Sequence, residues 1–162
     1  MEFALRQYEP NDEDAIVALS LRAWAPVFAS MRNVLGAELD TLLHGDDWRV
    51  HQANAVRGQL ADADATIWTA DSGGSVVGFV VAKVADADRR IGEIAMLAVD
   101  PSVQRRGLGS TLTEFATDWL REHGMRVAVV GTGGDDGHAP ARHVYEKANY
   151  TLMPIAQYFK AL

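Results

Sequence analysis

The sequence predicts an α/β (α+β) fold: one domain with a mixed central sheet of about six to seven strands, flanked by about four helices. Three observations lead to this prediction. The length of 162 residues suits one domain with one sizeable core. Strand-like segments come first as a meander and then alternate with helices. No internal repeat, low-complexity tract or long linker divides the chain, so residues 1–162 are expected to form a single domain.

The first half of the chain is predicted to contain three strands and two helices. A strand over 3–8 leads into a helix that Asn11 or Asp12 can cap and that continues to about residue 30. An apolar stripe at helical spacing supports this helix, formed by Ile16, Leu19, Ala23 and Val27. The remaining elements are a helix over about 47–61 and strands over 66–70 and 76–84, joined by the hairpin turn Asp71-Ser72-Gly73-Gly74.

The second half is predicted to alternate strands and helices. The expected elements, in order, are a strand over 91–99, an amphipathic helix from 107 to about 123, a strand over 127–130, a helix over 139–148 and a final strand over 151–159. Asp100-Pro101 ends the first of these strands, and Gly124 stops the first helix. Between strand and helix, Gly131-Thr132-Gly133-Gly134 is interpreted as a flexible wall of a cleft. Residues 135–138 could bind a cation but are interpreted as a solvated loop.

Composition and charge exclude several classes of function. Acidic residues outnumber basic ones by 22 to 15, and this net charge of −7 argues against nucleic acid as a partner and mildly favours a cationic substrate. With no cysteine, the chain has no disulfide, thiolate metal site or acyl-cysteine intermediate. The five histidines show no zinc-like spacing, so no metal is expected. The apolar stretch 76–82 is too short to span a membrane, and without an export signal the expected location is cytoplasmic.

A possible phosphate site lies in Gln104-Arg105-Arg106-Gly107-Leu108-Gly109, where a strand-to-helix loop enters its helix. Glycine lets an anion approach the free N–H groups of the first helical turn, and the two arginines add positive charge. A Walker loop needs Gly-Lys-Ser/Thr, which is absent, and Leu112 stands where a dinucleotide fingerprint needs its third glycine. Two interpretations stay open: a coenzyme A pyrophosphate site, or a tight turn without a ligand.

Two further side chains are candidates for chemistry. Glu93 lies in the nearly continuous apolar strand 91–99, where an isolated carboxylate is costly to bury. It is either a general base, or an anchor for the attacking amine, at a cleft, or it is a strand-end residue that faces solvent or pairs with Arg90. Tyr145 lies about a turn and a half into the helix that Pro140 begins, and is either a hydroxyl donor to a reacting atom or a core aromatic.

Together these elements resemble the GNAT superfamily of acetyl-CoA-dependent N-acetyltransferases. The resemblance rests on the order and spacing of Glu93, Gln104-x-x-Gly107-x-Gly109 and Tyr145-Glu146-Lys147, and covers about the last 70 residues closely. It implies acetyl-CoA as cosubstrate, Glu93 as the base for the amine, and Tyr145 as proton donor to the departing thiolate. It also implies a cofactor site formed by Leu97, Ala98, Val99, Gln104, Arg105, Arg106, Gly107, Leu108, Gly109 and Ser110, with His138 where the family often has asparagine.

The acceptor is expected to be a small-molecule or peptide amine. The resemblance implies a pocket in the first two helical segments, for which Trp24 and Trp48 are the candidates beside Glu93. Core packing is the competing interpretation of Trp24. A homodimer is possible, since the family often forms one. The alternative functions are a non-catalytic acyl-CoA-binding sensor and an unrelated binder of nucleotide phosphates.

Overall fold

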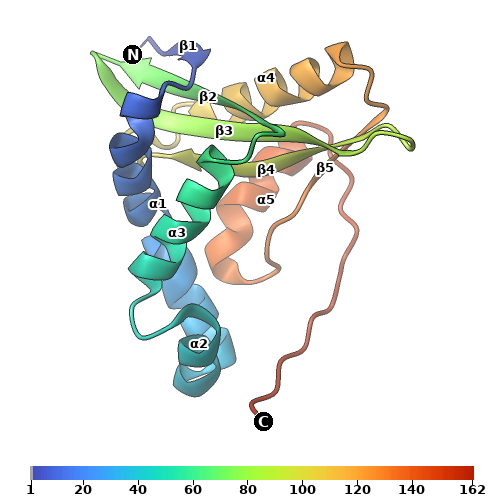
Figure 1. The fold of residues 1–162 in the computed structure, drawn as a ribbon. Helices are drawn as coiled ribbons and strands as arrows, with labels where there is room; N and C mark the ends of the chain where they lie inside the picture. The colour runs from blue at the N-terminus through green and yellow to red at the C-terminus, as the bar shows by residue number, and fades with distance from the viewer. Residues whose placement is uncertain (1) are drawn as a thin grey trace.

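The computed structural model describes residues 2–162 as one sheet covered by helices on both faces (Figure 1). The strands are β1 (Ala4–Gln7), β2 (Ala65–Ser72), β3 (Ser75–Asp86), β4 (Ile91–Val99) and β5 (Val127–Val130). The α-helices are α1 (Glu13–Leu35), α2 (Ala37–His44), α3 (Trp48–Leu60), α4 (Leu108–Glu122) and α5 (Ala139–Lys147). Short 3₁₀ turns are η1 (Pro10–Asp12), η2 (Pro101–Val103) and η3 (Asp136–His138).

The sheet is mixed, as predicted. Its strands lie in the order β1-β2-β3-β4-β5, with antiparallel neighbours up to β4 and a parallel β4–β5 pair. The predicted hairpin between β2 and β3 is confirmed, with Gly73 and Gly74 at φ of 58° and 82°. Two successive residues at positive φ match the turn type that suits the strand twist, and glycine adopts it without a Cβ clash.

Alternation along the strands divides the core into two layers. On β3, Val80 and Ala82 pack with Leu112 of α4 on one face, and all three are fully buried. Phe79 and Val81 point to the opposite face, where they pack with Ile16 of α1. Figure 1 shows α4 on one side of the sheet and α1, α3 and α5 on the other. The strands therefore separate two helical layers, and a side chain's position in its strand decides which layer it meets.

One helical stretch, Pro10–Leu35, is long and apolar enough by length and composition to cross a membrane; no other stretch among residues 2–162 is. Part of this helix is buried, because Ile16, Val17 and Leu19 pack against β3 and α3, but only 28% of its most apolar window is buried inside the fold. The helix runs five residues beyond the expected end and contains Pro26.

The predicted sheet of six to seven strands is wrong, because five strands form within the described residues. The expected last strand, 151–159, has no regular structure, and each of its residues is exposed. Pro154 in its middle removes a backbone donor that a paired strand would need. All four expected helices are present, and the eight-residue α2 lies between the first two. Gly36 and Gly45, at φ of 80° and 78°, stand at the two ends of α2. The whole of α2 therefore lies within the segment between the first two expected helices, which we expected to be a connection.

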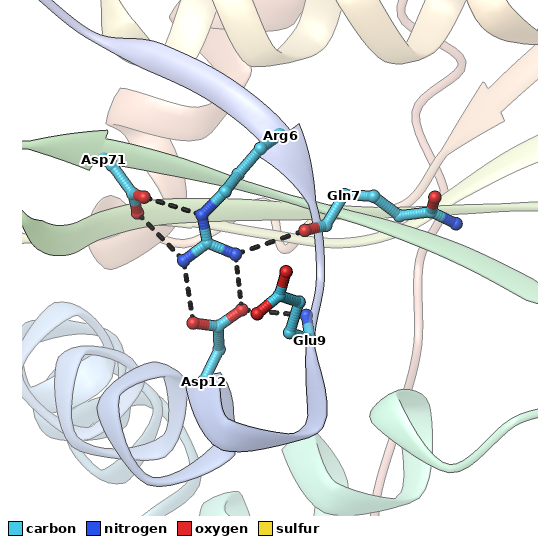
Figure 2. Close-up of polar contacts among 5 residues, drawn as sticks. All are labelled: Arg6, Gln7, Glu9, Asp12 and Asp71. Carbon is cyan, nitrogen blue, oxygen red and sulfur yellow. Dashed lines mark hydrogen bonds and ion pairs between the residues drawn. The ribbon is translucent and has the colours of Figure 1, made fainter.

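A cluster of ion pairs around one arginine, the Arg6 cluster, links the start of α1 to the edge of the sheet. Figure 2 shows Arg6 of β1 between two carboxylates. Its Nη1 and Nη2 donate to Asp12 at 2.7 and 2.8 Å, and its Nε donates to Asp71 of β2 at 2.7 Å. The backbone N–H of Glu9 also donates to Asp12, at 2.8 Å. The Arg6 guanidinium lowers the pKa of Asp12, because its hydrogen bonds outweigh the effect of burial.

Replacing Arg6 by methionine is expected to lower the free energy of unfolding by about 2 kcal/mol at pH 7. The cost comes from leaving Asp12 without its partner, and stays below the ~3–5 kcal/mol of a fully buried pair because 36% of the Arg6 side chain is exposed. The folded-state pKa of Asp12 is depressed, so its stabilisation is present above pH ~4 and is lost as the pH falls through that lowered pKa.

Urea denaturation at pH 7 and at pH 2 to 3 measures the effect. Arg57→Met is the control, because Arg57 pairs with Glu13 at 3.3 Å between side chains that are 46% and 42% exposed. Such a pair contributes about 0–1 kcal/mol. Equal losses of unfolding free energy in both variants would show that the Arg6 cluster stabilises the fold no more than an exposed ion pair does.

Candidate active site

A β-bulge opens one edge of β4. Between the pairs Ala82–Ile94 and Val81–Met96, β4 has one extra residue, Ala95. The parallel partner β5 pairs with β4 only from Ile91 to Ile94, so its pairing stops where the bulge begins. Within the described residues, no strand follows the rest of β4 on that side. A bulge bends its strand, and an open edge presents N–H and C=O groups to an extended ligand.

The loop after β4 is anchored to both β4 and α1. Asp100 accepts hydrogen bonds from the N–H and the hydroxyl of Ser102, at 2.9 and 2.7 Å, and forms an ion pair with Arg22 of α1. Burial alone would raise the pKa of Asp100, but the bonds from Ser102 and Arg22 outweigh it and lower that pKa. Gln104 Nε2 donates to the carbonyl of Val99 at 3.0 Å. The predicted cofactor residue Gln104 thus holds the end of β4.

The predicted motif opens helix α4, as expected. Gly107 is the N-cap in the left-handed region at φ 86°, and no side chain caps the helix there. Arg105 also has a positive φ, 62°, which is uncommon for a residue with a Cβ. The first helical N–H groups lack intrahelical partners and carry the positive end of the helix dipole. This end of α4 therefore suits an anion such as a pyrophosphate.

Replacing Gly107 by alanine is expected to weaken CoA binding about tenfold. A Cβ at Gly107 would meet no atom within 4 Å, so the cost comes from the left-handed backbone, about 1–2 kcal/mol per residue. The variant relieves this strain by moving the loop, which displaces the N–H groups. Isothermal titration with CoA measures the effect.

Gly124→Ala is the matched control, because Gly124 lies beyond the other end of α4 at φ 82° with equally open surroundings. Both variants should lose similar stability, and only Gly107→Ala should lose affinity. Equal CoA affinities of the two variants would show that the start of α4 does not take part in CoA binding.

Glu93 occupies the paired part of β4, just before the bulge. Its direct neighbours are Lys83 on β3 and Val129 on β5. Ile94 belongs to the layer of α4, so the Glu93 side chain points to the opposite face, on which α1 and α3 pack. Lys83 is paired with Asp62 at 3.3 Å. Glu93 is half-buried and has no hydrogen bond or ion pair within residues 2–162, with Arg90 or otherwise.

Tyr145 lies on α5, which packs against α4 and η3. Its ring centroid is 6.2 Å from that of Tyr150, whose hydroxyl is 2.7 Å from Thr117 Oγ1 of α4. The Tyr145 hydroxyl has no hydrogen-bond partner in the described part of the chain. Burial, and then the neighbouring Tyr150, raise the pKa of Tyr145 to about 12. The phenol therefore keeps its proton at neutral pH and can donate a hydrogen bond.

The fold brings the ends of three predicted site elements together. A Cβ placed on Gly109 of α4 would lie 3.6 Å from Val144 of α5 and 3.9 Å from Val99 of β4. Leu97 packs in the core layer of α4, and Ala98 is buried on the other face. The first turn of α4 carries Leu108, which is buried, and Ser110, which is half-buried, while Arg105 and Arg106 are exposed. The open edge of β4, the start of α4 and the residue beside Tyr145 thus meet at one place.

The glycine-rich loop before α5 is held by a buried carboxylate that sequence reasoning missed. Asp135 Oδ2 accepts from Ser30 Oγ of α1 at 2.5 Å, and Asp135 Oδ1 is 2.5 Å from His138 Nδ1. Burial would raise the pKa of Asp135, but the bonds from Ser30 and His138 prevail and lower it. The interpretation of 135–138 as a solvated loop is therefore wrong for Asp135 and His138. The Asp-x-x-His spacing was the available signal.

The two candidate tryptophans lie in different surroundings. Trp24 is half-buried against the core layer that contains Ile16 and Phe79. Trp48 stacks on Phe28, with ring centroids 4.6 Å apart. It lines a pocket of about 290 Å³ with Ala25, Ala29, Arg32 and Asp40. At 100° per residue, this side of α1 faces away from Ser30 and the loop before α5. No described contact links Trp48 to Glu93 or Tyr145.

Comparison with known proteins places these features in a family. The model of the Acetyltransferase (GNAT) family matches residues 29–150. A mycothiol acetyltransferase of Saccharomonospora viridis is 30% identical over 95% of this chain and 48% of its own length. Another mycothiol acetyltransferase, from Sanguibacter keddieii, is 33% identical over 94% of this chain and 44% of its own. The chain thus spans about half the length of the curated relatives it matches.

Solved structures show the same fold at lower sequence identity. A PaiA N-acetyltransferase of Thermoplasma acidophilum, in complex with coenzyme A, has a TM-score of 0.64 at 14% identity, covering 91% of this chain and 89% of its own. The ribosomal-protein-S18-alanine N-acetyltransferase of Escherichia coli has a TM-score of 0.64 at 19% identity, covering 91% of this chain and 76% of its own. The family match covers more than half of the chain, and the chain therefore belongs to the GNAT family of acetyltransferases.

Proposed function

We propose that residues 1–162 form one N-acetyltransferase domain, which moves an acetyl group from acetyl-CoA to a primary amine by direct attack. The observation that carries the proposal is the meeting of the open β4 edge, the uncapped start of α4 and α5 beside Tyr145. An extended arm can follow the strand edge while its phosphates reach the helix end. The family match and the CoA-bound structural relative support acetyl-CoA as cosubstrate.

In this proposal the cofactor site uses backbone more than side chains. Leu97, Ala98 and Val99 offer the open strand edge to the pantetheine arm, and the pyrophosphate binds the N–H groups from Arg105 to Ser110. The carbonyl of Val99 already accepts from Gln104, so Gln104 acts by shaping the loop. The exposed side chains of Arg105 and Arg106 add positive charge beside the proposed pyrophosphate site. The start of α4 then supplies the fixed dipoles that hold the phosphates.

Glu93 removes the proton of the amine, directly or through water. An alkylammonium has a pKa of about 10.4, so almost none of it is neutral at pH 7 without a base. Glu93 has no partner within the described chain, so its carboxylate is available for this task. The neutral nitrogen then attacks the thioester, with strand N–H groups near Leu97 stabilising the oxyanion. A thioester is already activated, and no covalent enzyme intermediate is needed.

Tyr145 donates a hydrogen bond to the departing sulfur. An ordinary thiol has a pKa of about 8.5, whereas that of Tyr145 is raised to about 12. The phenol therefore keeps its proton until negative charge develops on the sulfur. Its hydrogen bond stabilises the negative charge that develops on sulfur, and in this proposal Tyr145 is the donor of the proton that ends on sulfur.

The acceptor in this proposal is a small-molecule or peptide amine. The curated relatives are named for mycothiol, and one structural relative for a ribosomal-protein alanine, which supports both kinds. Trp24, on the same side of the sheet as Glu93, is the better candidate for the acceptor pocket. Trp48 lines a pocket on the outer side of α1 and is the weaker one.

A coupled assay tests the proposal. The protein is incubated with acetyl-CoA and a panel of amines, free thiol is recorded, and acetylated products are identified by mass spectrometry. Thiol release that depends on one amine class is expected. Tight CoA binding with no turnover on any amine would contradict catalysis and favour an acyl-CoA-binding sensor. Stabilisation by ATP or NAD but not by CoA would contradict the cofactor assignment.

A homodimer and a cytoplasmic location belong to the same proposal. The edge strand β5 exposes Val127 and Val129 by 53% and 44%, and the segment after α5 exposes Leu152, Met153 and Ile155. Such apolar surface beside an open sheet edge favours association with a second copy. The packing of Ile16, Val17 and Leu19 of α1 in the core supports a location away from the membrane. Light scattering on the purified protein measures the oligomeric state.

A further inference from the structure

Helix α5 carries Tyr145 and ends in a tight cap. The N–H of Tyr150 donates to the carbonyl of Tyr145 at 3.0 Å, and the N–H of Asn149 donates to the carbonyl of Glu146 at 3.0 Å. Asn149 has a left-handed backbone, at φ 64°. These two bonds and the left-handed residue form a Schellman motif, in which the residue after the left-handed one contacts a side chain in the last turn of the helix. The cap therefore brings the side chain of Tyr150 against that of Tyr145.

The two tyrosine rings lie side by side at this cap. Their centroids are 6.2 Å apart, and their planes are inclined by 55°. This separation lies within the range that aromatic pairs prefer, and the tilt avoids an unfavourable face-to-face arrangement. The ring of Tyr150 therefore limits the rotamers that the Tyr145 ring can adopt.

The ring of Tyr150 is itself fixed on α4. It packs against the buried cluster that includes Leu112 and Leu120, both residues of α4. Its hydroxyl is 2.7 Å from Thr117 Oγ1. Because Thr117 Oγ1 already donates to the carbonyl of Thr113 at 2.7 Å, the Tyr150 hydroxyl is the donor of this bond. Tyr150 is thus attached to the helix whose start is proposed to bind the pyrophosphate.

Helix α5 meets α4 at two places, which flank Tyr145 in the sequence. At one, Val144 lies beside the start of α4, because a Cβ on Gly109 would be 3.6 Å from Val144. At the other, Tyr150 packs on the buried side of α4. No residue of α5 is fully buried, so the position of this short helix depends strongly on such contacts. The placement of Tyr145 relative to the proposed pyrophosphate site therefore depends on Tyr150.

We propose that Tyr150 is a positioning residue, whose ring fixes the Tyr145 ring so that the Tyr145 hydroxyl meets the departing sulfur. The inference rests on the acetyl transfer proposed above, in which Tyr145 is the donor to that sulfur. Tyr150 touches no reacting atom and acts only through the rotamer of Tyr145. Asn149 supports it, because its left-handed backbone turns Tyr150 back onto the helix. A hydrogen bond weakens steeply with poor geometry, so this placement decides how well Tyr145 stabilises the charge on sulfur.

Kinetics of Tyr150 variants test the placement. Tyr150→Ala removes the ring and is expected to lower kcat at least about tenfold, since a catalytic group displaced by about 1 Å can cost about 100-fold in rate. The Kd of CoA should stay at the wild-type value, because the start of α4 is unchanged. Tyr150→Phe keeps the ring and the cap, and should keep the wild-type kcat. An equal loss of kcat in both variants, an unchanged kcat in Tyr150→Ala, or a parallel loss of CoA affinity would overturn the inference.

Variants of Asn149 test the cap without changing either ring. Asn149→Val places a β-branched side chain on a left-handed residue, which valine rarely adopts, and should lower kcat as Tyr150→Ala does. Asn149→Gly adopts the same φ freely and should keep the wild-type kcat. Gly124→Val is the matched control, because Gly124 is the left-handed residue, at φ 82°, beyond the end of α4. It should lose stability and keep its kcat. Equal losses of kcat in Asn149→Val and Gly124→Val would show a general loss of stability and overturn the inference.

A measurement without substrates separates this inference from the acetyl transfer itself. In protein with isotope-labelled tyrosine rings, Tyr145→Phe identifies the Tyr145 signal, and NMR relaxation measures how ordered that ring is. The ring should be ordered in the wild type and in Tyr150→Phe, and mobile in Tyr150→Ala. A mobile ring in the wild type, or an equally ordered ring in Tyr150→Ala, would overturn the inference at any rate of acetyl transfer. A ring that becomes mobile only in Tyr150→Ala, in a protein that acetylates no amine, would support the placement by Tyr150 and contradict the proposed function.

Discussion

Replacing Tyr145 by phenylalanine is expected to lower kcat about 100-fold while CoA still binds. The hydroxyl lacks a partner in the described chain, and its raised pKa of about 12 keeps the proton in place for a hydrogen bond to the leaving sulfur. Losing one such donor to developing charge costs about 10²–10³ in kcat. Because the pKa of Tyr145 is raised, its hydroxyl remains a donor well above pH 10, so its ionisation should not limit the wild-type rate below that pH. Steady-state kinetics from pH 6 to 10 measure both effects.

Tyr150→Phe is the matched control for this variant. Tyr150 also lies half-buried beside α5, but its hydroxyl is bonded to Thr117 at 2.7 Å. This variant should lose about 1 kcal/mol of stability, the usual net value of one hydrogen bond, and keep its kcat. If both phenylalanine variants lost the same activity, the effect would come from packing around α5, and the role of Tyr145 would be rejected.

The second large effect is expected for Glu93→Gln, with kcat/KM lowered about 100-fold at pH 7. Glutamine keeps the shape of the side chain but cannot accept the ammonium proton, so the variant depends on amine that is already neutral. For an amine of pKa about 10.4 that fraction is about one molecule in 2,500 at pH 7, and it rises about tenfold per pH unit. The difference from wild type should therefore narrow to a few-fold near pH 9. Rates at five pH values with a saturating acetyl-CoA concentration test this.

Glu114→Gln controls for the change of charge, because Glu114 is exposed on α4, on the face of the sheet opposite to Glu93. It should behave as wild type at each pH. If Glu93→Gln lowers kcat/KM by the same factor at pH 7 and pH 9, Glu93 orients the substrate without taking its proton. An unchanged kcat/KM at every pH would show that Glu93 has no part in the mechanism.

Local patterns in the sequence predicted most of the elements. The expected strands 91–99 and 127–130 match β4 and β5 residue for residue, because short apolar runs with clear end signals mark strands. The motif Gln104 to Gly109 predicted the start of α4, since glycine and the strand-to-helix order act within a few residues. The tail 151–159 was predicted wrongly, because an apolar pattern does not show whether a neighbouring strand exists to receive it.

The sequence by itself therefore determined the order of the strands and helices, the glycine motif proposed for phosphate at the start of α4, and the two residues proposed for chemistry, Glu93 and Tyr145. Only the tertiary structure decided the opening of β4 at the Ala95 bulge and the contact that joins Ser30 to Asp135 across 105 residues. The physical reason is the distance along the chain over which each effect acts. Helix and strand propensity, helix capping and turn formation depend on residues that are close together in the sequence. Strand register and buried hydrogen bonds depend instead on how distant segments pack, and that packing is what orients His138.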